Sequence, residues 1–77
     1  MLTIVIRHSA RKHGLSDDHI RHALRNHITQ TIGSNDLLLA IGPDPAGNLI
    51  EVGFVVDDEI IVVIHAMKAR NSIQRNL

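Results

Sequence analysis

The sequence lacks the side chains that cross-link small domains or stack on nucleic-acid bases. It contains no cysteine, which excludes disulfide bonds and thiolate chemistry. It contains no tryptophan, no tyrosine and only one phenylalanine, which argues against an RNA-binding surface built on aromatic stacking. The apolar residues are aliphatic and often β-branched, and such residues favour strands. We expect a single domain over residues 1–77 with a small core.

Long hydrophobic runs are also missing. No stretch is long and apolar enough to cross a bilayer, and the first residues do not form a secretory signal pattern. These absences predict a soluble cytoplasmic protein that does not act at a membrane.

Positive charge is absent from the middle of the chain. Residues 31–59 contain six acidic residues and no lysine or arginine. Residues 1–30 contain five bases against two acids, and residues 60–77 contain three bases and no acid, so each end has a net charge of +3. If the fold brings the two ends together, they form a cationic patch suited to phosphate.

The spacing of apolar residues predicts four strands. Residues 2–7 and 36–42 are short aliphatic runs, and residues 49–56 and 59–66 are two more, each bounded by turn residues. The segment GPDPAGN is strong turn chemistry and lacks the glycine spacing of a phosphate-binding loop.

Helical signals lie between the first two strands. A helix is predicted from Asp17 to about Ile28, with Ser16 as its N-cap and acidic residues in its first turn. Ser9 is the predicted cap of an earlier single turn that ends at Gly14. The order β-α-β-β-β plus a short tail predicts an α+β fold, with a short helical N-terminal region packed on an antiparallel sheet.

The last predicted strand is apolar on both faces, because it contains IIVVI. One helix cannot cover both faces of such a strand. We therefore predict that a partner, or a second copy of the chain in a homodimer, covers the other face. The alternative is that the tail folds back over it.

Six histidines raise the question of a metal site. His19 and His22 lie one turn apart on the predicted helix, but two imidazoles do not make a site. No thiolate and no HExxH pattern supplies the missing ligands, so we predict no metal and no other cofactor.

The residues that remain suit metal-free RNA cleavage. This chemistry needs a base, an acid and cations that offset charge on the phosphoryl oxygens. Histidine suits the proton transfers, and arginine suits the phosphate. The sequence holds such groups in two clusters: Arg11, Lys12 and His13 early, then His65, Lys68 and Arg70 late.

Glu51 is the only acid inside a predicted strand. Side chains alternate between the two faces of a strand, so Phe54 and Glu51 lie on opposite faces. Because Phe54 is expected in the core, Glu51 is expected to face solvent. A two-residue turn at residues 57–58 would place His65 opposite Ile50 on the core face, whereas a three-residue loop would place His65 opposite Glu51. The turn lacks the glycine that would decide between the two registers, so both stay open.

Three segments resemble small bacterial toxins of type II toxin–antitoxin pairs. They read SARKHGLSDDHIRHAL over residues 9–24, IGPDPAGNLIEV over residues 41–52 and VIHAMKAR over residues 63–70. A group of short actinobacterial proteins has the same ordered pattern of ARKHG, GPD-AGNLLEV and IHAM-AR. Its layout is similar to that of BrnT-type toxins and of the wider RelE-like ribonuclease group.

The resemblance implies a compact α+β ribonuclease-like fold with an antiparallel sheet, cleavage of mRNA and growth arrest. It implies a cognate antitoxin as partner, a small DNA-binding protein whose complex with the toxin represses their operon. Carried over onto this chain, the basic positions of the family correspond to Arg11, Lys12, His13, His65 and Arg70.

The leading hypothesis is therefore a metal-independent endoribonuclease toxin with an RNA substrate. His65 is the predicted proton shuttle, with His13 or Glu51 as its partner. The cations predicted to bind RNA are Arg11, Lys12, Lys68 and Arg70. The alternative hypothesis is a degenerate toxin, a module without catalysis that binds nucleic acid or protein through the same residues.

Overall fold

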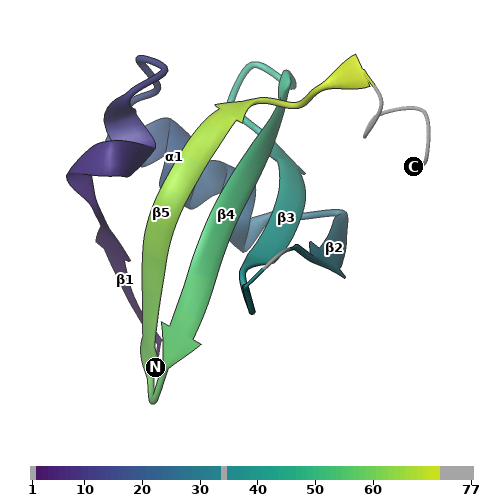
Figure 1. Ribbon diagram of the computed structural model, residues 1–77. Coiled ribbons are helices and arrows are strands. Elements are labelled where there is room, and N and C mark those ends of the chain that lie inside the picture. Colours follow the sequence, from purple (N-terminus) through teal and green to yellow (C-terminus); the bar gives the residue numbers. More distant parts are fainter. Residues whose placement is uncertain (1, 34, 72–77) are drawn as a thin grey trace.

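Five strands form one mixed sheet in the computed structural model, which describes residues 2–33 and 35–71. The elements are β1 (Thr3–Ile6), the 3-10 helix η1 (His8–Arg11), α1 (Asp17–Arg25), β2 (Thr29–Ile32), β3 (Leu38–Pro43), β4 (Leu49–Asp57) and β5 (Ile60–Lys68). The strand order is β1-β5-β4-β3-β2, and α1 lies against one side of the sheet (Figure 1). The predicted α+β class is confirmed. Within the described ranges, no helix has the length and apolar character needed to span a membrane.

The prediction of an antiparallel sheet is wrong for β1. This strand pairs in parallel with β5, from Thr3 opposite Ile60 to Ile6 opposite Val63, whereas the other neighbours are antiparallel. A parallel pair needs a long connection, and here the whole chain between the two strands supplies it. The first and last strands are thereby brought side by side.

The helix is shorter than predicted, and an edge strand follows it. α1 ends at Arg25, where the side chain of Asn26 donates to the His22 carbonyl over 2.8 Å. The next residues, Thr29–Ile32, form the strand β2, for which no element was predicted. Ile28 had the spacing of the helical stripe, but its side chain is 61% exposed. At the other end of the chain β5 continues to Lys68, and the predicted tail lies mostly outside the described residues.

The core lies between α1 and the sheet. Ser16 caps α1 as predicted, because its hydroxyl accepts from the His19 N–H over 3.1 Å. Phe54 lies on the core face of β4, as expected. The buried residues that form this cluster are Ile6, Ala10, Ile20, Ala23, Leu24, Ala40, Ile50, Val52, Phe54, Val63 and Ala66.

No helix formed by the described residues lies over the opposite side of the sheet, which we call the helix-free face (Figure 1). It exposes Val5, Ile60 and Ile64, which are 44%, 41% and 38% accessible to solvent. In contrast, Val63 points into the core and is fully buried. The sequence prediction that one apolar side of the last strand stays uncovered by the helix agrees with this arrangement. That a partner covers it stays a prediction.

Candidate active site

A buried carboxylate lies at the centre of the predicted site residues. Glu51 on β4 is 0% exposed, so the expectation that it faces solvent is wrong. Its Oε1 accepts from the backbone N–H and from Nε of Arg70, over 3.2 and 2.9 Å. Its Oε2 lies 3.1 Å from Nη2 of Arg70 and 3.1 Å from Nε2 of His65. Four donors therefore surround one carboxylate, which is how a buried charge is kept stable.

His65 reaches Glu51 because of an irregularity in the β4–β5 ladder. From the turn upwards Asp57 pairs with Ile60 and Phe54 with Val63, but Gly53 pairs with His65. Without this one-residue shift His65 would lie on the core face. Neither register considered from the sequence is the observed one, because the turn residues are Asp58 and Glu59 and the ladder then shifts by one residue at Gly53.

Gly53 makes this shift possible, and it was a signal in the sequence. A side chain at Gly53 would lie 3.2 Å from Cβ of His65 and 3.3 Å from Leu37. A glycine inside a strand often marks a bulge or a close approach. Here it leaves room for His65 on the same face as Glu51.

His13, from the N-terminal part of the chain, lies next to His65. Its ring centroid lies 5.9 Å from that of His65, and the two rings meet edge to face at 82°. η1 is held against β5 by the Ser9 hydroxyl, which donates to the Ile64 carbonyl over 2.6 Å. The predicted role of Ser9 as a helix cap is therefore wrong, because η1 has no side-chain cap. We call Glu51, His65, Arg70 and His13 the Glu51 cluster.

The predicted cations are placed unequally around this cluster. Arg11 forms a two-pronged ion pair with Asp17, with contacts of 2.8 and 2.9 Å. Hydrogen bonds from Arg11 hold the pKa of Asp17 below its ordinary value, and the pKa of Arg11 is raised in return. Lys12 is exposed. Lys68 pairs with Ile50 and borders a hollow beside Asp44, so it lies on the helix side of the sheet, away from His65.

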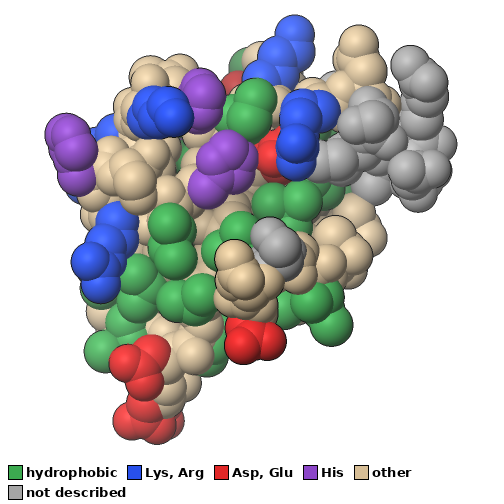
Figure 2. Space-filling view, in the orientation of Figure 1, with side chains coloured by type: hydrophobic (Ala, Val, Ile, Leu, Met, Phe, Trp, Pro, Cys, Tyr) green, Lys and Arg blue, Asp and Glu red, His purple; other side chains and the backbone are tan. Residues whose placement is uncertain are grey.

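Charged side chains divide between the two ends of the helix-free face. Figure 2 shows histidine, lysine and arginine side chains gathered at its upper end and acidic side chains at its lower end. The condition set from the sequence for a cationic patch is met, because η1 packs on β5 and brings the two basic ends together.

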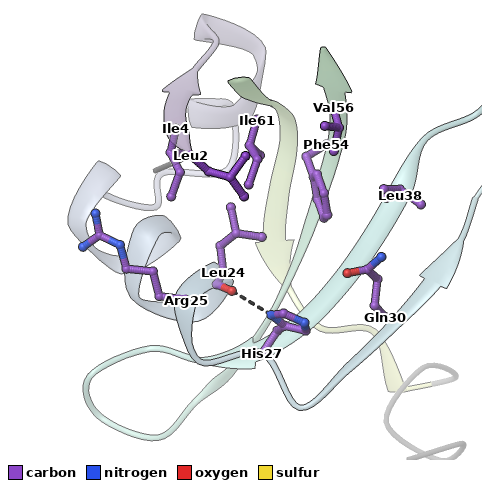
Figure 3. Close-up of a pocket in the computed structure, with 10 residues that line it drawn as sticks. All are labelled: Leu2, Ile4, Leu24, Arg25, His27, Gln30, Leu38, Phe54, Val56 and Ile61. Atoms are coloured by element: carbon purple, nitrogen blue, oxygen red, sulfur yellow. Dashed lines mark hydrogen bonds between the residues drawn. The ribbon is translucent and has the colours of Figure 1, made fainter. Parts of the chain in front are cut away.

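A separate apolar hollow of about 400 Å³ lies on the helix side of the sheet (Figure 3). It is lined by Leu2, Ile4, Leu24, Arg25, His27, Gln30, Leu38, Phe54, Val56 and Ile61. The His27 ring is held through Nδ1, 2.8 Å from the Leu24 carbonyl (Figure 3). No residue predicted as a site residue lines this hollow. The sequence signal for it was weak, because its apolar residues have the spacing of ordinary core positions.

The described ranges contain no group of three or more histidine, aspartate or glutamate side chains able to share a metal ion. Of the helical pair weighed from the sequence, His22 is engaged elsewhere, since its Nδ1 lies 2.8 Å from the Pro43 carbonyl. The carboxylate of Glu51 is likewise occupied by hydrogen bonds from His65 and Arg70.

The turn between β3 and β4 depends on Asp44 in its ionised form. Burial raises the pKa of this carboxyl, but hydrogen bonds from the backbone and side chain of Asn48 and from the Ala46 N–H together lower it below its ordinary value. The stabilisation is therefore complete above the unfolded pKa of about 4 and is lost as the pH falls through the folded pKa.

We expect Asp44→Asn to be less stable than the parent at neutral pH, with a difference that shrinks as the medium becomes acidic. Urea unfolding followed by circular dichroism, at neutral pH and well below the aspartate pKa, measures this. Asn48→Ala should show a smaller loss of the same sign, because it removes only the side-chain bond to Asp44. A pH-independent difference for Asp44→Asn would contradict the lowered pKa.

Comparisons of this chain with known protein families, with curated proteins and with solved structures found no match.

Proposed function

We propose that this chain is a metal-independent endoribonuclease, the toxin of a type II toxin–antitoxin pair, which cleaves mRNA in the cytoplasm. The observation that carries the proposal is the Glu51 cluster. Its two histidines lie 5.9 Å apart, and an arginine shares a buried carboxylate with one of them. These are the base, the acid and the cation that cleavage through the RNA 2′-hydroxyl requires.

Glu51 acts in this proposal as a positioning residue. Its Oε2 accepts from Nε2 of His65, which favours the tautomer with the proton on Nε2 and leaves a lone pair on Nδ1. Nδ1 then takes the proton of the 2′-hydroxyl as that oxygen attacks phosphorus. His13, as imidazolium, gives a proton to the 5′-oxygen as its bond to phosphorus breaks.

Arg70 and Lys12 supply the positive charge that the phosphate needs. Nε and Nη2 of Arg70 are bound to Glu51, so the two N–H groups of Nη1 are left for phosphoryl oxygens. The Arg70 side chain is 58% exposed, which makes these donors accessible. Arg11 contributes less, because Asp17 neutralises it.

The proposed protein partner is a cognate antitoxin, a small DNA-binding protein, as the sequence resemblance implies. To neutralise the toxin, it has to cover the Glu51 cluster or the exposed cations beside it. The antitoxin would then compete with RNA for one surface.

One observation favours a second candidate function, a nucleic-acid-binding module without catalysis. Nε2 of His65 and two nitrogens of Arg70 are already bound by Glu51, which ties the end of β5 to β4. The same contacts would be expected of a purely structural ion-pair cluster. In that case the exposed cations bind RNA, and nothing cleaves it.

His65→Gln separates the two functions, with His27→Gln as the matched control on the other side of the sheet. Glutamine keeps a donor for Glu51 but cannot act as a base. We expect the parent and His27→Gln to cleave RNA equally, with or without a chelator. We expect His65→Gln to lose at least about 100-fold in rate while still binding RNA. Cleavage is measured on a purified transcript, and growth arrest is followed after induced expression.

Folded parent protein that leaves RNA intact in both assays would reject the nuclease. If such protein binds RNA, and Lys12→Ala lowers the slope of affinity against salt by about one, the binding module is supported. Equal cleavage by the parent and His65→Gln would keep the nuclease but reject the Glu51 cluster as its site.

A further inference from the structure

The helix-free face has an apolar middle between two ends of opposite charge. Val5, Ile60 and Ile64 are all more than a third exposed, and Val62 pairs with both Val5 and Val55 on this side of the sheet. Figure 2 views this face and shows the apolar side chains lying between the acidic and the basic groups. An exposed apolar surface rimmed by charges is typical of a protein interface.

The acidic end is formed by the loops at the lower ends of the strands. It holds four exposed carboxylates, those of Asp36, Asp57, Asp58 and Glu59. The last three are consecutive: Asp57 ends β4, and Asp58 and Glu59 form the β4–β5 turn. No arginine or lysine occurs between residues 31 and 59, so nothing along this stretch of sequence offsets their charge.

The basic end is formed by η1, the loop after it and the end of β5. It holds the exposed cations Arg7, Lys12 and Arg70 and the paired rings of His13 and His65. Since β5 has nine residues, the two ends are separated by roughly 25 Å along the strand. The charges are therefore far enough apart to act as two distinct contact regions.

We propose that the helix-free face binds a second copy of this chain, face to face and with the strands antiparallel. A two-fold axis lying across the strands places the acidic end of each copy against the basic end of the other. The alternative two-fold axis, along the strands, would place like charges together. Charge complementarity thus selects one arrangement, in which the apolar middle meets its own copy.

The size of the face does not rule out such a dimer, because its upper limit falls within the range of standard specific interfaces. The molecule measures 32 × 24 × 23 Å, so one face covers at most about 770 Å². A standard specific interface buries about 800 Å² on each partner. Self-complementarity favours a second copy over an unrelated protein, because every favourable contact occurs twice.

The dimer would set the acidic turn of one copy over the Glu51 cluster of the other. Its carboxylates would occupy the region where phosphate binds, so dimer formation and RNA binding would exclude each other. This consequence rests on the proposed function. The proposed dimer does not rest on that function, because sedimentation measures the molecular mass and not RNA cleavage.

Two charge reversals test the dimer, Glu59→Lys at the acidic end and Lys12→Glu at the basic end. Sedimentation is followed from about 1 to about 500 µM, the range that includes weak interfaces of this size. We expect the parent to rise from 8.5 kDa towards twice that mass. Each reversed variant alone should dimerise about tenfold more weakly, because two ion pairs per dimer become repulsive. An equal mixture of the two variants should recover the parental affinity, since opposite charges again meet at both contacts.

Asp18→Lys and Arg21→Glu are the matched controls, because these residues lie on α1, behind the sheet. They should leave the dimer unchanged. A parent that stays monomeric at the highest concentration would overturn the proposal and leave the face to a different protein. A mixture no tighter than its two components would also overturn the antiparallel arrangement.

Cross-linking checks the geometry without charge changes. Because the chain has no cysteine, a single one can be placed at Val62, near the middle of the face. A short bis-maleimide should link two Val62→Cys copies, since facing sheets lie about 10 Å apart. It should not link Ile32→Cys, which is 78% exposed on the edge strand β2. The reverse result would show that the copies pair through β2 and would reject the proposed face.

Discussion

Gly42→Ala is expected to destabilise the protein strongly, and far more than Gly47→Ala. A Cβ atom at Gly42 on β3 would overlap the Ala23 carbonyl oxygen and would lie 2.9 Å from Cα of His27. Both are backbone atoms at the end of α1, so no flexible side chain can move aside. The helix would have to lift from the sheet and expose the core that it covers. We expect a loss on the order of 4–5 kcal/mol, which would leave a chain of this size largely unfolded.

Gly47→Ala is the matched control, because it tests backbone strain without a clash. Gly47 has a φ of +90°, and its added methyl would meet nothing within 4 Å. We expect roughly 1–2 kcal/mol for the left-handed backbone alone. Urea unfolding of both variants measures the difference. If Gly42→Ala were the milder of the two, α1 would not pack against β3 as closely as the structure has it.

The sequence correctly predicted those features that depend on residues close to one another along the chain. The Ser16 cap, the acidic first turn of α1 and the inward side of β4 at Phe54 follow from spacing and side-chain type. What spacing could not show is which strand lies beside which, and so the parallel pairing of β1 with β5 was missed.

The sequence predicted which residues belong to the candidate site, but it did not predict how they are arranged. His65, Arg70 and His13 were named from their chemistry, and the structure brings them to Glu51. The contact between His65 and Glu51 could not be decided from the sequence, since it depends on a one-residue shift at Gly53. Such a shift turns a side chain to the other face of the sheet. It depends on how the two strands pair, and therefore on residues that are far apart in the sequence. The short polar strand β2 was missed because it lacks apolar alternation.

Arg70→Met is expected to destabilise the protein more than Glu51→Gln does, although both break the same ion pair. Glu51 is 0% exposed, so removal of Arg70 leaves a buried carboxylate with fewer donors, at about 3 kcal/mol or more. Arg70 is 58% exposed, so removal of the charge on Glu51 leaves an arginine that water can solvate. We expect the latter change to cost about 1–2 kcal/mol. Urea unfolding at neutral pH measures both.

The double variant gives the sharper result, because the two losses should not add. Once Arg70 is methionine, Glu51→Gln removes the unpaired buried charge and should restore stability relative to Arg70→Met alone. Additive losses would instead mean that Arg70 and Glu51 do not share one buried interaction. The double variant would also be folded while lacking the cation proposed to bind phosphate. Loss of RNA cleavage by this folded protein could then be assigned to the missing guanidinium and the altered His65 contact, and not to unfolding.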